Sequence, residues 1–404
     1  MIIFYDDARA RRFEPFATTL PLAEMRMGAL LQRERWQEVL HAAPRGFVSS
    51  PHLEGFAEFD APPAHVGDVP AGTWLVNTRA VPLLDTVRST ATVLAIDHQV
   101  AAVKLAAAVS REQLQDVMFA LEDVLPSTGS MANIPGVWLE NVWDLVAHLQ
   151  TVLQADIPAV TQRTEAVPLA DGIATILGSH GVFVEADATI EPQVVFDTTL
   201  GPVLLRRGAV VQAFSRVAGP CYVGREASVL GGRVAGCAIG DVCRVHGELS
   251  ASILVGHSNK GHDGFVGHSV LGRWVNLGAG TTTSNLKNTY GTVSLWTPDG
   301  VQDTKLQFLG TLFGDHAKTG IGLRLTTGCV VGAGANVFDA MPPKAVAPFS
   351  WGGAPPYGRF AEEQFVNTAE RMMARRHVVM SASARGWWRR VHAVASADAR
   401  WPRG

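Results

Sequence analysis

Cysteine is scarce in this sequence of 404 residues, and it shows no pairing pattern. There is no C-x-x-C motif and no dense framework, which is typical of reduced, buried thiols rather than disulfides. A zinc site built from Cys237, Cys243 and two histidines is not favoured, because paired short spacings are absent. The four cysteines are Cys221, Cys237, Cys243 and Cys329.

Long apolar runs and an excess of one charge are also missing. No apolar run approaches the ~18 residues that span a bilayer. The charged start MIIFYDDARARR lacks the apolar stretch of a signal peptide. Lys plus Arg number 34 and Asp plus Glu 37, a net charge of −3, which excludes a strongly basic chain that coats nucleic acid. We therefore expect a cytoplasmic protein that binds neither a membrane nor nucleic acid.

Glycine is abundant but unevenly placed. Thirty of the 40 glycines lie between Gly172 and Gly353, whereas the first 165 residues hold only seven. This contrast predicts two architectures in one chain.

Residues 1–165 show the mixed pattern of an α/β domain. Short apolar runs predict strands, and apolar residues at helical spacing predict helices. Pro158 and Pro168 are predicted to frame a linker. The expected strands are Met1–Tyr5, Thr73–Thr78 and Val93–Ile96, and the expected helices are Pro21–Val39, Glu112–Val124 and Val142–Gln154.

The glycine-rich region repeats with a period of six residues. Neither a helix nor a simple strand has this period, which suits a solenoid with one short strand and one turn per hexad. A β-sandwich in which aliphatic residues happen to be spaced by six is a poorer explanation than a solenoid, because so many positions match. The positions predicted to point into the core are Leu205, Val211, Val217, Val223, Val229, Ile239, Val245, Phe265, Leu271 and Leu277.

Two segments depart from the hexads. Gly291–Asp303 contains the turn signal PDG and is predicted to form a hairpin or loop that projects from the solenoid. Beyond Pro355, Glu362–Ser381 and Trp387–Ser396 favour helices that pack on the protein or stabilise a trimer. The predicted domains are therefore residues 1–165, 166–350 and 351–404.

One segment within the hexads, Ser258–Asn288, resembles the acetyltransferase domain of the bifunctional enzymes that make UDP-N-acetylglucosamine. It shares their Gly-His pair, their V-N-[IL]-G-A-G-T motif and a later Asn at matching spacing. The likeness to a subgroup with an abbreviated sugar nucleotidyltransferase domain extends over nearly all of residues 1–375. Its further motifs are Tyr5-Asp6-Asp7, Leu20-Pro21-Leu22, Glu24–Gly28, Gly201-Pro202-Val203, Asn285–Gly291, Gly314–Ile321 and Phe349–Gly353.

This resemblance implies a fold, an assembly and an activity. The fold is an α/β nucleotidyltransferase-like domain, then a left-handed parallel β-helix, then a helical C-terminal arm. The assembly is a homotrimer. The activity is acyl transfer from acetyl-CoA to an amino-sugar phosphate, together with nucleotidyl transfer from a nucleoside triphosphate to a sugar-1-phosphate. The expected partners are thus a nucleotide sugar or sugar phosphate.

The resemblance also assigns roles in the acyl transfer. His262 is the expected base, because a neutral imidazole has a pKa near working pH, and Asn276 and Asn285 orient the site. Phe265 stands where the family has a tyrosine. The expected substrate contacts are Phe265, Lys260, Lys287, His316 and Lys318, and the expected acetyl-CoA contacts are Gly278, Ala279, Gly280 and Thr281. His257, His268 and His316 are alternative bases.

The N-terminal domain departs from the nucleotidyltransferase pattern. Its first strand runs into Asp-Asp-Ala-Arg-Ala-Arg-Arg, and the glycine loop that would hold phosphates is absent. Arginines could supply charge instead, although a solvated basic turn explains them equally well. The candidate phosphate contacts are Arg9, Arg11, Arg12 and Arg26, and the candidate Mg²⁺ contacts are Asp6, Asp7 and Asn77.

Two further functions remain open from sequence. The absence of the tyrosine favours a nucleotidyltransferase whose β-helix serves assembly and regulation. The missing glycine loop favours a trimeric scaffold that binds a nucleotide sugar without catalysis.

Overall fold

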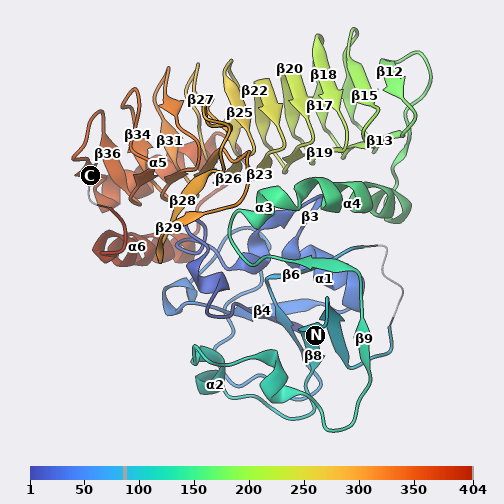
Figure 1. Ribbon diagram of the computed structural model, residues 1–404, viewed down its shortest axis with the longest axis vertical. Helices are drawn as coiled ribbons and strands as arrows, with labels where there is room; N and C mark the ends of the chain where they lie inside the picture. The colour runs from blue at the N-terminus through green and yellow to red at the C-terminus, as the bar shows by residue number, and fades with distance from the viewer. Residues whose placement is uncertain (85–88, 403–404) are drawn as a thin grey trace.

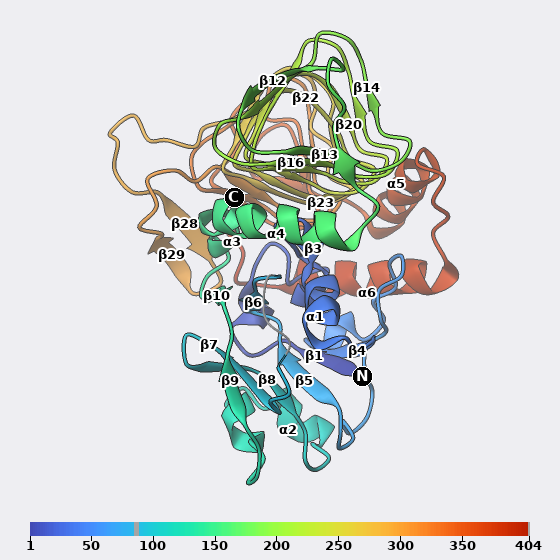
Figure 2. The ribbon, with the colours of Figure 1, turned by 90° about the vertical axis from the view of Figure 1, so that its right-hand side faces the viewer.

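The computed structural model describes residues 1–84 and 89–402. An N-terminal α/β domain lies against one long side of a β-solenoid (Figure 1). Of two C-terminal helices, one lies along the solenoid and the other between the solenoid and the N-terminal domain (Figure 2). The fold class predicted from sequence is confirmed in these three parts. No helix within the described residues is long and apolar enough to cross a membrane.

The N-terminal domain is built on a six-stranded sheet in the order β4-β1-β5-β8-β7-β9. Strand β1 is parallel to both β4 and β5, so the carboxyl ends of these three strands meet at one edge. The strands are β1 Ile2–Tyr5, β4 Pro44–Val48, β5 Trp74–Asn77, β7 Val93–Ile96, β8 Gln99–Lys104 and β9 Met131–Asn133, with small pairs β2 Arg26–Met27, β3 Leu30–Leu31, β6 Ala80–Pro82 and β10 Gly136–Trp138. The helices are α1 Gln32–Leu40, α2 Arg111–Gln115, α3 Asp144–Ala147 and α4 Leu149–Arg163.

All three predicted N-terminal helices are wrong in extent: the one predicted over 142–154 is α3 and α4, which end only at Arg163. Within the range 21–39 only a 3₁₀ turn at Leu22–Glu24 and α1 are helical, because Gly28 (φ +66°) turns the intervening chain into the β2–β3 hairpin. Only α2 and a 3₁₀ turn at Leu121–Val124 form within 112–124, and the Asp116 side chain accepts from the Met118 amide where α2 ends. Pro158 lies inside α4 and does not begin a linker.

The solenoid stacks parallel strands on several faces and is seen end-on in Figure 2. Its longest sheet has ten strands. Val203 pairs with Cys221 and Leu312 with Val330, partners that are 18 positions apart, or three hexads per coil. This sheet comprises β11 Val167–Pro168, β13 Val182–Val184, β16 Val203–Leu205, β19 Cys221–Val223, β21 Ala238–Ile239, β23 Ile253–Gly256, β26 Val270–Arg273, β30 Thr311–Phe313, β33 Cys329–Val331 and β35 Ala345–Val346.

The other faces carry shorter strands. The nine-stranded sheet comprises β12 Thr175–Gly178, β14 Thr189–Ile190, β15 Val195–Thr198, β17 Val210–Val211, β18 Ser215–Ala218, β20 Ser228–Ala235, β22 Arg244–Ser250, β24 Asn259–Lys260 and β25 Phe265–Gly267. The later coils contribute β27 Thr282–Thr283, β31 Lys318–Thr319, β32 Arg324–Leu325, β34 Asn336–Val337, β36 Ser350–Gly352 and β37 Gly358–Arg359.

The hexad residues form the solenoid core as predicted, with one exception. Nine of the ten predicted positions are at most 1% exposed. Phe265 is only half-buried, and the neighbouring Val266 occupies the interior instead. All four cysteines lie in this apolar core. Burial raises the pKa of Cys237 to about 11, so the thiols act there as small apolar groups.

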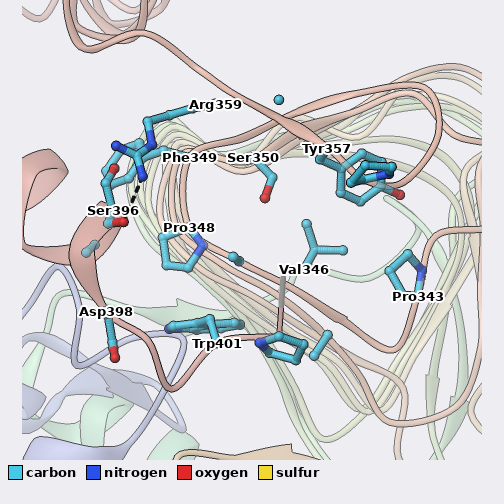
Figure 3. Close-up of a pocket in the computed structure, with 16 residues that line it drawn as sticks. Pro343, Val346, Pro348, Phe349, Ser350, Tyr357, Arg359, Ser396, Asp398 and Trp401 are labelled. Carbon is cyan, nitrogen blue, oxygen red and sulfur yellow. Dashed lines mark hydrogen bonds between the residues drawn. The ribbon is translucent and has the colours of Figure 1, made fainter. Parts of the chain in front are cut away.

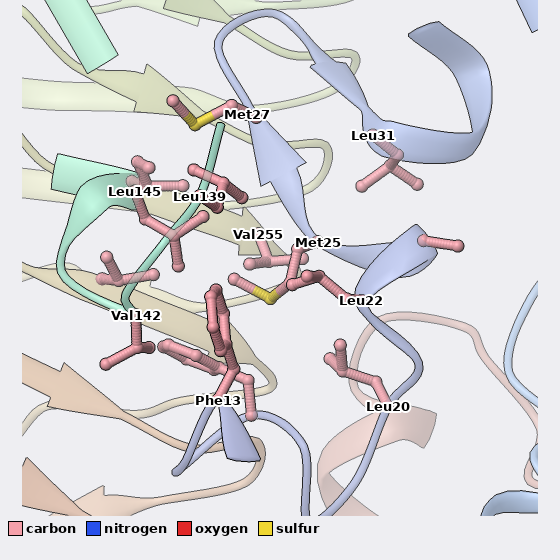
Figure 4. Close-up of a cluster of buried hydrophobic side chains, with 14 of the residues drawn as sticks. Phe13, Leu20, Leu22, Met25, Met27, Leu31, Leu139, Val142, Leu145 and Val255 are labelled. Carbon is pink, nitrogen blue, oxygen red and sulfur yellow. The ribbon is translucent and has the colours of Figure 1, made fainter. Parts of the chain in front are cut away.

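A second core joins the two domains. Side chains such as Leu204 and Tyr222 alternate with the interior residues of the ten-stranded sheet and face the N-terminal domain. Figure 4 shows Val255 of β23 among Met25, Leu139 and Leu145. Apolar burial of this kind stabilises by about 25 cal/mol per Å², so the two domains support each other.

The predicted hairpin and the C-terminal helices complete this interface. The hairpin is β28 Ser294–Thr297 paired with β29 Gly300–Asp303. It packs on the rest of the chain through Trp296, whose ring centroid lies 4.0 Å from that of Trp401. The arm consists of α5 Glu362–Ala374 and α6 Ala382–Ala397, which bury Phe365, Trp387 and Trp388.

Candidate functional site

His262 lies on a small insertion at one corner of the solenoid. Strand β22 bends around this corner, with Arg244 paired to Asn259 on one face and Glu248 paired to Phe265 on the next. The first pair is 15 positions apart and the second is 17. The coil that carries His262 therefore has two more residues at the bend than the preceding coil, which contains β22. These residues push the exposed His262 outward from the solenoid.

A cavity of about 450 Å³ opens beside this corner, and we call it the His262 cavity. It brings together three residues predicted from sequence, His262, Asn276 and Lys318. The C-terminal arm closes one side with the end of α5. The remaining lining residues are Leu230, Arg244, His257, Asn259, Gly261, Met372, Arg375 and Arg376.

Asn276 is held by the stacking of the coils. It forms parallel bridges with Asn259 on the coil before and with Lys318 on the coil after. The Asn259 Nδ2 donates to the Asn276 Oδ1 at 3.0 Å, which leaves the Asn276 Nδ2 to donate to a ligand. The Lys318 Nζ donates to the His316 carbonyl at 2.9 Å, and burial lowers the pKa of Lys318 to about 8.

The other predicted acyl-transfer residues lie on the next face. Phe265, Asn285 and Lys287 line a separate groove of about 710 Å³ along β25, β27 and β32. The Asn285 Nδ2 lies 2.8 Å from the His268 Nδ1, and the His268 ring stacks on Phe308. The predicted residues therefore form two groups, one on each face that meets the His262 corner.

Lys260 was expected to contact the substrate, but its side chain lies inside the solenoid corner. Its side chain is buried, and its Nζ donates to the carbonyls of His246 and His262. This lysine thus holds the backbone of the corner. Burial lowers the pKa of Lys260 to about 8.

The four predicted acetyl-CoA contacts form a turn between coils. The Gly278 amide donates to Thr319, and the Thr281 hydroxyl lies 2.9 Å from that of Thr319, so Thr281 is interior. A Cβ at Gly278 would overlap the Gly320 carbonyl of the next coil, which explains the glycine. Ala279 and Gly280 are exposed.

His316 does not reach a ligand-accessible surface, which corrects its prediction as a substrate contact. It is fully buried in an aromatic cluster, stacked on Trp274 with its edge toward Trp388. Burial lowers its pKa well below the usual value. Its neighbour Asp315 accepts from the Arg273 amide and from Thr19 of the N-terminal domain, so it joins the two domains.

The predicted metal ligands lie at the carboxyl ends of β1 and β5 but do not fit Mg²⁺. Asp6 is buried, and both its oxygens accept hydrogen bonds, from Thr78, Ser49 and Leu22. Asp7 accepts from the Asn77 Nδ2 at 2.9 Å and from Arg79. The Asn77 Oδ1 accepts from the Arg79 amide. Within residues 1–84 and 89–402, no three His, Cys, Asp or Glu side chains are arranged to hold a metal ion.

The predicted phosphate-binding arginines are paired with other groups. Arg9 pairs with Glu140, which also contacts Arg79, and Arg12 pairs with Asp299 of the β28–β29 hairpin. Arg11 donates to the carbonyls of Asp6 and Leu114. Asp7, Arg9, Asn77, Arg79 and Glu140 form a charge-balanced group that we call the strand-end cluster.

Arg26 occupies a second interdomain position. It is buried, donates to the carbonyls of Val255 and Ala29, and lies over the Tyr222 ring. It also lines a cavity of about 310 Å³ between the domains, together with Arg206 and Tyr222. Its hydrogen bonds to backbone carbonyls give it a role in domain packing.

A further cavity of about 260 Å³ lies at the C-terminal end of the solenoid (Figure 3). Tyr357, Arg359, Asp398 and Trp401 are among its lining residues. The Arg359 Nη2 donates to the Ser396 carbonyl at 2.9 Å. None of the residues predicted from sequence to act in catalysis or binding lines this cavity.

Several lining residues of the His262 cavity escaped the sequence-based prediction, among them Arg244, Arg375 and Arg376. Arg375 and Arg376 follow α5 and lie more than 100 positions from His262, so no local spacing relates them. His257 was expected only as an alternative base. It stacks between Phe59 and Trp274, and burial lowers its pKa to about 4. The sequence offered only the basic character of Arg244 and of the Arg375-Arg376 dipeptide as a signal.

Comparison with known proteins supports the resemblance. Residues 2–165 match a family model described as sugar nucleotidyl transferase. A stretch of 154 residues is 28% identical to the bifunctional protein GlmU of Picosynechococcus sp., covering 38% of this chain and 26% of the relative.

Two other relatives give shorter matches. A bifunctional sugar-1-phosphate nucleotidylyltransferase/acetyltransferase of Sulfurisphaera tokodaii is 31% identical over 91 residues, 22% of this chain and 23% of the relative. The bifunctional protein GlmU of Methanococcus vannielii is 31% identical over 93 residues, 22% of each chain. The matched segments thus span about a quarter of the length of these curated relatives.

Proposed function

We propose that this chain is a two-domain transferase of nucleotide-sugar synthesis, with CoA-dependent acyl transfer to an amino-sugar phosphate at the His262 cavity. The observation that carries the proposal is the convergence of His262, Asn276 and Lys318 on one cavity, from three successive coils. The names of the relatives, which include nucleotidylyltransferase and acetyltransferase, agree with this combination.

Acyl transfer to an amine requires a base, an oriented acceptor and a stabilised oxyanion. The exposed imidazole of His262 accepts a proton from the amine as the amine nitrogen bonds to the thioester carbonyl carbon. The carbon–sulfur bond then breaks, and the His262 imidazolium returns the proton to the sulfur, so that CoA leaves as a thiol. The Asn276 Nδ2, fixed by Asn259, donates to an acceptor oxygen, and the Lys318 ammonium supplies positive charge.

For residues 2–165 we propose nucleotidyl transfer to a sugar-1-phosphate. The match to the sugar nucleotidyl transferase family supports this assignment, and the strand-end cluster lies at the edge where parallel strands end. Because the predicted magnesium ligands are satisfied by protein groups, no catalytic step is assigned to a metal here.

Two assays on the full chain test these activities separately. Free thiol released from acetyl-CoA in the presence of glucosamine-1-phosphate reports acyl transfer. Exchange of labelled pyrophosphate into nucleoside triphosphates, with a sugar-1-phosphate present, reports nucleotidyl transfer. We expect both signals. Pyrophosphate exchange without thiol release would leave the β-helix a structural and regulatory element. The absence of both signals would favour a binding scaffold.

A trimer is also proposed from the resemblance. The two groups of predicted residues face different sides of the His262 corner, so a neighbouring copy is needed to bring them into one site. Sedimentation equilibrium showing three chains per particle would support this arrangement, and a monomer would contradict it.

A further inference from the structure

Three arginines converge on the His262 cavity from two separate parts of the chain. Arg244 comes from β22 of the solenoid, and Arg375 and Arg376 come from the end of α5. Lys318 adds a fourth basic group. Among the described residues that line this cavity, none is an aspartate or a glutamate, so its walls carry positive charge without an opposing carboxylate.

Packing of α5 fixes the backbone that carries the arm arginines. Helix α5 buries Phe365, Val366 and Met373, and the Arg376 amide donates to the Met373 carbonyl at 2.8 Å. Ordered groups of this kind bind a ligand with a smaller entropic cost than mobile side chains do. The arm is therefore a rigid wall of the cavity.

The charges of these arginines are not neutralised within the described chain. Arg244, Arg375 and Arg376 form no ion pair within the described residues, whereas Arg389 of the same arm pairs with Glu363. The Nε of Arg376 is buried and has no hydrogen-bond acceptor among the described residues. Burial and the neighbouring charges of Arg244 and Arg375 lower the pKa of Arg376.

The attraction of cations at a helix C-terminus explains only part of this arrangement. A helix dipole favours basic residues in the last turn, but it does not require Arg244 from the solenoid to face them. Like charges in a cavity repel each other unless an anion joins them. Guanidinium groups pair with phosphate through two parallel hydrogen bonds, so a phosphate is the anion that these residues suit.

We propose that Arg244, Arg375 and Arg376 form a phosphate-binding subsite in the His262 cavity, so that the C-terminal arm supplies ligand-binding groups to the solenoid. The ligand is a phosphate ester or anhydride. Its source is the phosphate of the acceptor sugar or the nucleotide phosphates of the acyl donor. This proposal rests on the proposed function for the reaction at His262, but phosphate binding is measurable without turnover.

Calorimetry on the full chain tests the subsite directly. The probes are glucosamine-1-phosphate and adenosine 3′,5′-bisphosphate, with unphosphorylated glucosamine for comparison. The variants are Arg244→Gln and Arg376→Gln. Arg371→Gln is the matched control, because it removes the same charge from a position of α5 that does not line the cavity.

Arg244→Gln and Arg376→Gln are each expected to weaken binding of one phosphorylated probe by about 10- to 100-fold, the loss of a charge-assisted hydrogen bond. Arg371→Gln and glucosamine should show no such change. Weaker binding of the sugar phosphate alone identifies the acceptor as the source, and weaker binding of the bisphosphate alone identifies the donor. Unchanged affinity for both probes overturns the proposal. If no thiol is released but phosphate binding depends on these arginines, the proposed acyl transfer is wrong and the phosphate-binding subsite is confirmed.

Discussion

The strand-end cluster of the N-terminal domain and the His262 cavity of the solenoid contain similar side chains in opposite electrostatic settings. In the cluster, Arg9 and Arg79 are paired with Glu140, and Asp7 also contacts Arg79. In the cavity, three arginines converge on a space that no described carboxylate lines. Paired charges hold a structure together, whereas converging unpaired charges are suited to a ligand.

The same contrast extends through the two domains. The N-terminal domain buries charged groups such as Arg35 and Asp156, while the interior of the solenoid is lined by small aliphatic residues and cysteines. The predictions that follow test this difference in order of expected effect.

The largest effect is expected from a charge placed inside the solenoid. Val266→Asp should lower the free energy of unfolding by more than about 4 kcal/mol, because an unpaired carboxylate would be buried. Phe265→Asp, one residue away and half-buried, should cost at most about 2 kcal/mol. Urea unfolding followed by circular dichroism measures both. Equal losses would show that the corrected core position is wrong.

A buried ion pair in the N-terminal domain should give the next largest effect. Arg35 donates to both oxygens of Asp156 at 2.8 and 2.5 Å, and neither side chain is exposed. Asp156→Ala is expected to cost about 3–5 kcal/mol, since it leaves a buried guanidinium unpaired. Glu248→Ala breaks the half-exposed pair with Arg233 of the solenoid and should cost about 0–1 kcal/mol. A loss below 1 kcal/mol for Asp156→Ala would remove the contrast between the domains.

Glu58 gives a pH-dependent test of the interface between the domains. It is buried 3.5 Å from Arg273, and burial raises its pKa to about 8. Between the ordinary value of 4.5 and 8, the folded chain binds a proton that the unfolded chain has lost. Stability contributed by this group is therefore present below pH 4.5 and falls as the pH rises toward 8.

Glu58→Gln should flatten the dependence of stability on pH in that window. One proton corresponds to a slope of at most about 1.4 kcal/mol per pH unit. Unfolding curves at half-unit steps from pH 5 to pH 8 provide the measurement. A slope unchanged in the variant would show that Glu58 does not bind the proton.

The smallest effect is expected at the hairpin. Arg12 and Asp299 join the N-terminal turn to the β28–β29 hairpin, but both side chains are substantially exposed. Arg12→Ala should cost at most about 1 kcal/mol. A double-mutant cycle with Asp299→Ala isolates the pair. A coupling free energy above 2 kcal/mol would make the pair a major joint between the domains.

The sequence predicted the solenoid more accurately than the N-terminal domain. A period of six residues identifies the interior positions directly, and it fails only at Phe265, where the two-residue insertion shifts the register. The segment 21–39 has helical spacing over its whole length, but packing of Met25 and Met27 into the interdomain core and the turn at Gly28 override that preference.

The candidate site was predicted only where its residues belong to recognisable motifs, Ser258–Asn288 for His262 and Asn276 and Gly314–Ile321 for Lys318. His262 and Asn276 lie within a single short segment and do line one cavity. Arg375 and Arg376 meet them only after α5 folds back on the solenoid, and Lys260 looks like a ligand contact until its burial is known. Local sequence carries no information on such long-range contacts.

The central claim is that the His262 corner carries out acyl transfer independently of the N-terminal domain. It is tested most directly by measuring thiol release and pyrophosphate exchange for His262→Asn, with the exposed His180→Asn as control. We predict that His262→Asn lowers kcat for thiol release by about 10²- to 10⁴-fold, the loss of a general base, and leaves pyrophosphate exchange unchanged. Full thiol release by His262→Asn would contradict the account.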